Sequence, residues 1–173
     1  MATPNVPVRA SEHPLDAFRA GARFASEDLP LGRLGGAKHI GVNLTAIPPG
    51  AQSCPFHWHL KEEEHFYVLE GRCVLRSGEG RHEMQAGDYV CFPAGTRVAH
   101  CFENPFDAPC KMLAIGPDLP DEICGYPDSD KLRIRALGMS FPIPTAAVDY
   151  WHGERVSEPL DRAPAGSKSS PSR

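Results

Sequence analysis

Several features that would assign this chain to a common class of protein are scarce or missing. Its 18 Lys and Arg residues are outnumbered by 22 Asp and Glu, giving a net charge of -4 at pH 7. No basic excess is present to hold a phosphate backbone, so we expect no nucleic-acid partner. No apolar run reaches the roughly 18 residues that a membrane-spanning helix needs, and the N-terminal stretch MATPNVPVRASEH lacks the apolar core of a secretion signal. We therefore expect a cytoplasmic protein that does not enter a membrane.

The sequence also lacks the short motifs of several enzyme classes. It contains no G-x-S-x-G, no phosphate-binding loop and no dinucleotide fingerprint, and HLKEEEH has too many residues between its histidines for a zinc-protease helix. Six cysteines occur without a C-x-x-C pair. Without a secretion signal we expect reduced thiols, with Cys73, Cys91 and Cys101 packed as small strand residues.

What the sequence does contain is a series of short segments rich in Val, Ile, Phe and Tyr, separated by turns. Gly and Pro are frequent, at 16 and 18 residues, and they punctuate the segments. From His39 onward the segments follow at intervals of about ten residues: HIGVNLTAI, FHWH, EHFYVLE, RCVLR, RHEMQ, DYVCF, RVAHCFE and CKMLAIG. Neither an internal repeat nor a βαβ alternation is present, so the pattern predicts an all-β sandwich or barrel.

The composition changes along the chain and predicts four parts. Residues 1–36 read as an N-terminal arm with one short helix at residues 16–25, DAFRAGARFA. Residues 37–116 form the barrel. Residues 117–156 form a C-terminal extension that packs on the barrel and includes a strand, KLRIRAL, and the aromatic patch DYW. Residues 157–173 have the composition of a disordered tail.

Two histidines and an acid stand where a strand hairpin would bring them together. On a strand, residues i and i+2 share a face, so His57 and His59 present their imidazoles side by side. The next strand begins at Glu64, with Phe66 and Val68 on the same face, and its carboxylate can sit beside both rings. Glu63 is a rival for this acid position.

The neighbouring charged residues have simpler interpretations. With Glu64 as the acid, Glu62 and Glu63 are expected to be solvated turn charges. His65 falls on the opposite face of the strand from Glu64 and is expected at the surface or in packing. The other histidines lack ligand spacing: His13, His39, His82 and His152.

His100 is the candidate for a further ligand. It lies on an alternating segment with Val98 and Phe102 as same-face neighbours, which points its ring into an apolar cavity. Buried polar groups without partners cost roughly 1 to 3 kcal/mol each, so three imidazoles and a carboxylate in such a cavity favour a shared cation. Imidazole and carboxylate suit one divalent transition metal, and leave Mn, Fe, Ni, Co, Cu and Zn open.

These residues also resemble the two ordered motifs of the cupin superfamily. The first, roughly G-x5-H-x-H-x(3,4)-E-x6-G, is matched by Gly50, His57, His59, Glu64 and Gly71 with one extra residue after Gly50. The second, roughly G-x5-P-x-G-x2-H-x3-N, is matched with two extra residues before its histidine, by Gly87, Pro93, Gly95, His100 and Asn104. The resemblance implies a double-stranded β-helix, or jelly-roll barrel, with His57, His59, Glu64 and His100 as metal ligands, and a homodimer.

The function that follows is a small-molecule metalloenzyme, with a non-catalytic binding or sensor module as the alternative. A divalent ion with one glutamate ligand favours anionic oxygen donors such as carboxylates, enolates and sugars. The resemblance allows a sugar or sugar-phosphate isomerase or epimerase, a lyase or a dioxygenase. A third hypothesis is a structural barrel in which the metal only stabilises the fold. Glu63, His65 and Tyr67 are the nearest residues for a catalytic base, but His65 and Tyr67 face away, so no base is assigned.

Overall fold

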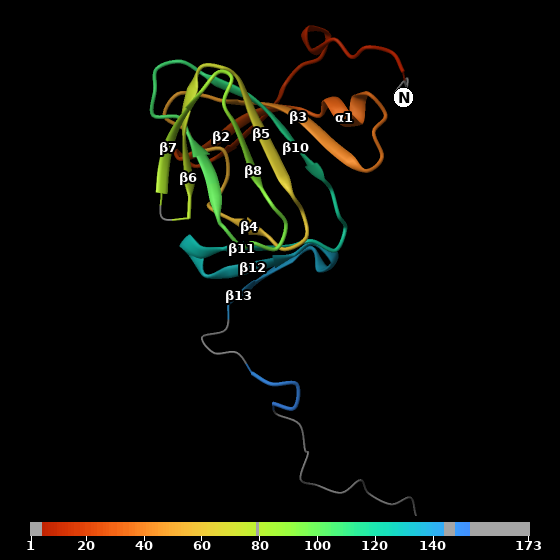
Figure 1. Ribbon diagram of the computed structural model, residues 1–173, viewed down its shortest axis with the longest axis vertical. Coiled ribbons are helices and arrows are strands. Elements are labelled where there is room, and N and C mark those ends of the chain that lie inside the picture. The colour runs from red at the N-terminus through yellow and green to blue at the C-terminus, as the bar shows by residue number, and fades with distance from the viewer. Residues whose placement is uncertain (1–4, 79, 144–147, 153–173) are drawn as a thin grey trace, which may run out of the picture. The chain divides into compact units, whose positions relative to one another are not determined.

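Antiparallel strands make up most of the structure, a computed structural model that describes residues 5–78, 80–143 and 148–152 (Figure 1). The strands are β1 (Asp16–Ala20), β2 (Phe24–Leu29), β3 (Ile40–Ile47), β4 (Trp58–His59), β5 (Glu64–Glu70), β6 (Arg72–Ser77), β7 (Gly80–Gln85), β8 (Tyr89–Phe92), β9 (His100–Glu103), β10 (Cys110–Pro117), β11 (Ile123–Tyr126), β12 (Lys131–Ile134) and β13 (Met139–Pro142). The helical turns are short: η1 (Ala10–Glu12), α1 (Leu31–Leu34), η2 (Pro127–Ser129) and η3 (Arg135–Leu137). The all-β prediction is confirmed.

Two sheets enclose the apolar core. The larger has six strands in the order β1-β2-β3-β10-β5-β8, and the smaller has three in the order β7-β6-β9. Side chains from both fill the space between them, including Ile47, Val68, Leu75 and Phe102. Alternation along β5 buries Phe66 and Val68 and leaves Tyr67 exposed, as period-two patterning requires. This arrangement agrees with the jelly-roll barrel expected from the sequence.

The helix predicted for residues 16–25 is wrong. These residues form most of a hairpin, in which β1 and β2 pair through a turn at Gly21, whose φ is +62°. Alanine and arginine favour a helix intrinsically, but a glycine in the left-handed region and the open edge of β3 favour strand pairing. β2 pairs with β3, placing Asp28 opposite Thr45. The segment read as an arm therefore adds two strands to the larger sheet.

A third sheet is built from the C-terminal extension. It has four strands in the order β13-β12-β11-β4, and β11 pairs with β4 so that Cys124 lies opposite His59. The strand predicted at residues 131–137 is confirmed for β12, after which the chain turns into η3. Hydrogen bonds between strands thus connect the predicted arm to the barrel across residue 36, and the barrel to the predicted extension across residue 116. The limits of the four predicted parts stay predictions.

The remaining C-terminal residues form a second unit, residues 144–173. Within it the structure describes residues 148–152, where the backbone N–H of Trp151 donates to the Asp149 carboxylate over 2.9 Å. Packing of this aromatic patch on the barrel stays a prediction. The predicted tail, residues 157–173, lies outside the described residues. Among the residues described, no helix has the length and apolar character to cross a membrane.

Close packing at one glycine fixes how β11 approaches β4. A Cβ atom added at Gly125 would lie 2.1 Å from the indole ring of Trp58, which packs against the buried Phe56, Ala99 and Cys101. The Trp58 indole therefore occupies the space that any larger residue at position 125 would need. The neighbouring His59 is held in the same two-residue strand.

We predict that Gly125→Ala lowers the free energy of unfolding by about 1–3 kcal/mol, because overpacking displaces Trp58 or β11. Ser140→Ala, at an exposed position in the same sheet, is the control and should change stability by less than about 0.5 kcal/mol. Guanidinium unfolding followed by Trp fluorescence gives both values. Equal stabilities for the two variants would contradict the packing argument.

Candidate metal centre

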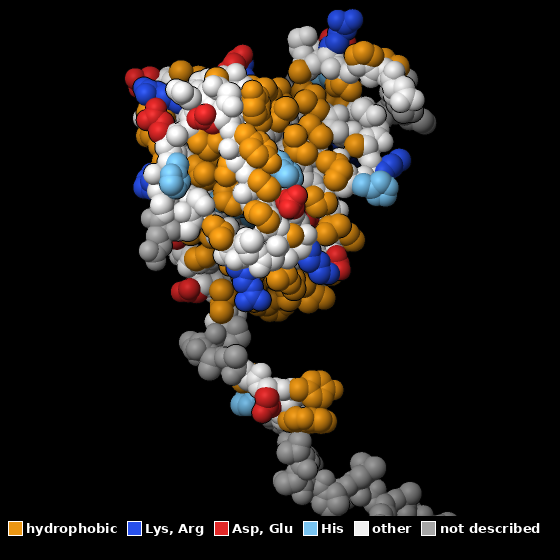
Figure 2. Space-filling model, viewed as in Figure 1, with side chains coloured by type: hydrophobic (Ala, Val, Ile, Leu, Met, Phe, Trp, Pro, Cys, Tyr) orange, Lys and Arg blue, Asp and Glu red, His pale blue; other side chains and the backbone are white. Residues whose placement is uncertain are grey.

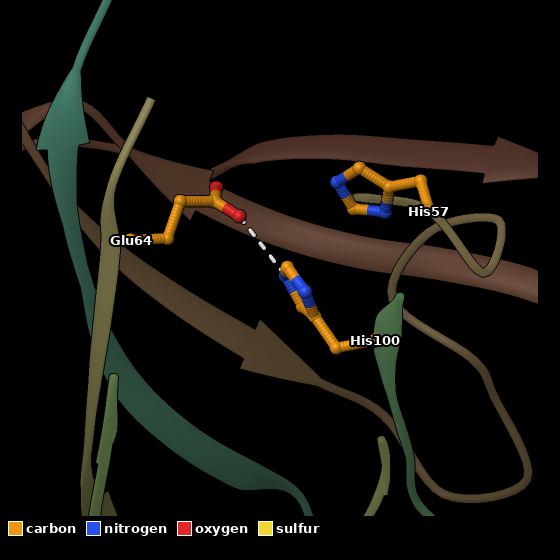
Figure 3. A group of neighbouring side chains, drawn as sticks. All are labelled: His57, Glu64 and His100. Atoms are coloured by element: carbon orange, nitrogen blue, oxygen red, sulfur yellow. Dashed lines mark ion pairs between the residues drawn. The ribbon is translucent and has the colours of Figure 1, made fainter. Parts of the chain in front are cut away.

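Three of the four predicted ligands meet at one end of the barrel (Figure 3). His57 precedes β4, Glu64 opens β5 and His100 opens β9, so the side chains converge from three segments. A ligand atom of each lies within 4.8 Å of the others. His57 and His100 also form a two-way backbone bridge, with N–H to O distances of 3.1 and 2.8 Å. The bridge sets the separation of the two rings.

Apolar side chains surround the His100 ring, which is almost fully buried. Phe92 stacks on it with 3.8 Å between ring centroids, and Phe66 and Phe102 pack nearby. Val98, predicted to share this cavity, is instead 42% exposed. The strand begins only at His100, after a loop in which Arg97 has φ of 55°, so strand alternation does not extend back to Val98. The prediction for Val98 is wrong, and that for Phe102 is right.

The contacts of Glu64 are those of ligands around a common ion. Its Oε2 lies 2.9 Å from His100 Nε2 and 3.2 Å from His59 Nε2. All three atoms are buried, yet none has a hydrogen-bond partner among the described residues. Two ligands each about 2.1 Å from one ion and at right angles lie about 3 Å apart. The donor set and its spacing therefore fit a shared divalent cation.

The electrostatics of the site keep His57 and Glu64 in the forms that bind a metal. Burial, together with nearby His100 and His59, lowers the pKa of His57 to about 4, so its imidazole is neutral at pH 7. Burial works against the charge on Glu64, but contacts with His100 and His59 outweigh it and lower the pKa of this carboxyl. Neutral imidazole and ionised carboxylate are the states that coordinate metals.

His59 takes part in two clusters at once. Its Nε2 approaches Glu64, while its Nδ1 lies 3.2 Å from Glu62, 4.0 Å from Glu122 and 3.5 Å from the Cys124 sulfur. Burial opposes a charge on this ring, but Cys124, Glu62 and Glu64 raise its pKa to about 12. A carboxylate that accepts from one ring nitrogen orients the other nitrogen toward a metal. The arrangement therefore directs Nε2 of His59 to the same place as the other donors.

The prediction that Glu62 is a solvated turn charge is wrong. Its side chain is only 4% exposed and pairs through both oxygens with Arg135, with a distance of 2.9 Å from Oε2 to Nη2. It also accepts the Leu119 N–H at 2.6 Å. Burial opposes the charge, but contacts with His59 and Arg135 lower the pKa of Glu62. Because Arg135 is 73 residues away in sequence, no local pattern could have indicated this partner.

Glu63 and His65 lie where the sequence placed them. Glu63 is half exposed and contacts His65 at 3.0 Å, on the face of β5 opposite Glu64. The other nitrogen of His65 lies 2.7 Å from the Tyr89 hydroxyl. None of His13, His39, His82 and His152 belongs to a group of metal-binding side chains in the part of the chain that the structure describes. All six cysteines are free.

Two cavities meet at the candidate centre, and His57, Glu64 and Ala114 line both. The inner cavity, of about 300 Å³, extends into the barrel past Ser26, Asp28 and Thr45. The outer pocket, of about 490 Å³, is lined further by the polar side chains of Arg33, Asn43, His59, Glu62, Asp118 and Arg135. A larger hollow of about 630 Å³ near Gly71 and Phe106 contains none of the predicted ligands. The site thus offers room for a ligand on both sides of its donor atoms.

Comparison with known proteins decides the family. A family model for the Cupin domain matches residues 43–116. The structure of a sugar phosphate isomerase of the cupin superfamily from Silicibacter pomeroyi is similar at a TM-score of 0.66 and 35% identity, over 72% of this chain and 81% of that one. This chain belongs to the cupin superfamily. Its jelly-roll barrel is the double-stranded β-helix of that superfamily.

Two further proteins are similar to this chain. A proposed sugar phosphate isomerase from Acidithiobacillus ferrooxidans is 32% identical at a TM-score of 0.64, over 68% of this cupin and 74% of that chain. An uncharacterized protein from Methanocaldococcus jannaschii is 32% identical over 47% of this cupin. The matched region spans 57% of the length of that protein. Cupins commonly bind a divalent metal, and the His/Glu group of this cupin provides candidate ligands.

Several residues of this cupin's site were not found from the sequence. The N-terminal hairpin and α1 contribute Asp28 and Arg33 to the cavity walls, and the C-terminal sheet contributes Glu122 and Cys124 beside His59. Tyr126 stacks on His57 with 5.8 Å between ring centroids. These residues lie outside the two motifs, in segments interpreted as arm and extension. No motif marked Asp28, which lies in the mixed polar and apolar segment FASEDL of β2.

We predict that Arg135→Met destabilises this cupin by about 2–3 kcal/mol, because Glu62 stays buried without its cation. The matched control is Arg133→Met on β12, where the arginine is exposed and forms no ion pair with the described residues. Urea unfolding at pH 7 measures the difference. If both variants unfold at the wild-type midpoint, Arg135 does not support Glu62.

Proposed function

We propose that this cupin is a metal-dependent isomerase of sugar phosphates. The observation that carries the proposal is a cluster of buried, unpartnered imidazole and carboxylate atoms at the junction of two cavities. Similarity to the two structures named above, at 32% and 35% identity, supports the reaction class. The residues at the site suit small oxygen-rich anions as substrates, and a sugar phosphate is one of them.

The proposed ligands are His57, His59, Glu64 and His100, holding one divalent transition metal. When bound, the metal supplies a Lewis acid that polarises a carbonyl or hydroxyl oxygen. The protein's part is to hold three imidazole rings and one carboxylate in place, and the single carboxylate leaves a centre with a divalent ion net positive. That charge favours the negatively charged oxygen of an ionised sugar.

Arg33 supplies the second element of substrate recognition. It is exposed on α1 at the wall of the outer pocket and forms no ion pair with any residue that the structure describes. Arg135 lines the same pocket, but Glu62 and Asp118 already bind its guanidinium. Guanidinium groups bind phosphate through paired hydrogen bonds. We therefore expect the substrate's phosphate at Arg33 and its carbonyl end at the metal centre.

An exposed apolar surface supports the expected homodimer. Figure 2 shows hydrophobic side chains across the face that β5 and β8 present. Tyr67, Leu69 and Tyr89 on these strands are each at least 41% exposed. A patch of this kind is unusual on a monomer and marks a contact surface. The dimer and the cytoplasmic location stay predictions.

We predict that His57→Ala combined with His59→Ala abolishes bound metal and leaves a folded sheet. Two of the four donors are lost, and the remaining pair cannot complete a tetrahedral or octahedral shell. Metal content of the purified protein by inductively coupled plasma mass spectrometry, with far-UV circular dichroism, measures both effects. His82→Ala, at an exposed position on β7, is the control and should keep wild-type metal content. Full occupancy in the double variant contradicts the ligand assignment.

We predict that the metal-loaded protein interconverts an aldose phosphate and its ketose, followed by NMR across a panel of pentose and hexose phosphates. Arg33→Ala should raise KM by about tenfold or more at nearly constant kcat, because it removes a binding contact distant from the reacting carbons. Arg19→Ala, an exposed arginine on β1, should leave both constants unchanged.

Other results of the same assay would overturn the proposal. Tight binding of sugar phosphates without turnover would favour the non-catalytic module. Release of a smaller fragment would favour a lyase, and consumption of oxygen a dioxygenase. An unchanged KM in Arg33→Ala would place the phosphate elsewhere.

A further inference from the structure

The inner cavity contains one carboxylate that the candidate metal centre does not use. Two acids line this cavity, Glu64 and Asp28. Glu64 contacts the rings of His59 and His100, whereas Asp28 stands on the wall formed by β2. The rest of the lining is apolar, or consists of hydroxyl, thiol and imidazole groups. Asp28 thus lines the same cavity as His57, Glu64 and His100.

Two hydroxyl groups hold the Asp28 carboxylate in a fixed orientation. Ser26 Oγ donates to Oδ2 and Thr45 Oγ1 donates to Oδ1, each over 2.6 Å. Thr45 lies directly opposite Asp28 in the pairing of β2 with β3, so the backbone register fixes this contact. Each carboxylate oxygen can accept a second hydrogen bond. One acceptor position on each oxygen is therefore left for a molecule in the cavity.

The Asp28 carboxylate does not serve as the partner of a positively charged side chain. It forms no ion pair with Lys, Arg or His in the described ranges of the chain. A partly buried carboxylate without a cation is unfavourable for folding, and such groups concentrate at functional sites.

We propose that Asp28 carries the proton between the two reacting carbons of the substrate, an inference that rests on the proposed isomerase function. The Asp28 carboxylate removes the proton from C2 of the aldose phosphate. The C–H electron pair forms the C1–C2 double bond, and the carbonyl electrons move to O1. A proton passes from O2 to O1, the C2 carbonyl forms, and the Asp28 carboxylic acid returns its proton to C1. Atoms and charge balance without an oxidant or reductant.

The other groups near the cavity are less suited to this step. Burial raises the pKa of the Cys54 thiol to about 11, so this group is a neutral thiol at pH 7. His65 and Tyr67, considered as bases from the sequence, do not line the cavity, and Glu63 is paired with His65 outside it. Asp28 belongs to a hairpin that precedes the two cupin motifs, so the motifs could not identify it.

The test compares Asp28→Asn with the full-length wild type, both loaded with the same metal. The variant keeps the shape of the side chain and removes the base, so kcat should fall by roughly 10²-fold or more. Exchange of the substrate's C2 hydrogen with D2O, read by NMR, should fall in parallel, while metal content stays at the wild-type value. Glu27→Gln, at the exposed neighbouring position on β2, should keep full activity.

The outcomes separate this inference from the function on which it rests. A wild type that isomerises sugar phosphates while Asp28→Asn retains kcat and C2 exchange within a few-fold overturns the role of Asp28 alone. A wild type with no isomerisation and no C2 exchange overturns the proposed function and this role with it. If Asp28→Asn does not fold, Thr45→Val removes one donor to the carboxylate and should lower kcat and C2 exchange together. Unchanged exchange in Thr45→Val overturns the inference.

Discussion

The approach of two imidazoles to one carboxylate oxygen is the constraint on which the site depends. His59 and His100 both place Nε2 beside Glu64 Oε2, and no hydrogen bond satisfies these buried atoms. Such an arrangement is costly unless a cation shares the donors. The backbone bridge between His57 and His100 and the aromatic ring of Phe92 hold it in place. In the proposed function, the positive charge of the metal centre follows from this one cluster.

The barrel supplies the donor atoms, and the segments on either side of it supply what surrounds them. The N-terminal hairpin brings Asp28 to the inner cavity and α1 brings Arg33 to the outer pocket. The C-terminal extension brings Glu122 beside the second nitrogen of His59 and Arg135 beside Glu62. In the proposed function, the motifs of the superfamily bind the metal, and the flanking segments determine which molecule reacts and how.

Sequence reasoning succeeded where one strand's alternation decides the outcome. The parity of β5 placed Glu64, Phe66 and Val68 on the inner face, and the two motifs located His57 and His100. It failed where a partner lies far along the chain. Glu62 is buried because the third sheet covers it, and residues 16–25 are strands because β3 offers them an edge. Composition indicates which secondary structure a segment prefers by itself. The burial of Glu62 and the strands at residues 16–25 depend instead on pairing with segments elsewhere in the fold. The C-terminal unit and the metal assignment stay predictions.

The pairing of β4 with β11 has a consequence for synthesis on the ribosome. Cys124 lies opposite His59 across 65 residues of chain, and Arg135 follows later still. Chains elongate at roughly 5–20 residues per second, so β4 emerges several seconds before β11, the strand that pairs with it. During that interval the ring of His59 lacks its acidic neighbour at position 122. In the proposed metal centre, a nascent chain would therefore hold His59 in its metal-binding orientation only after β11 has left the ribosome.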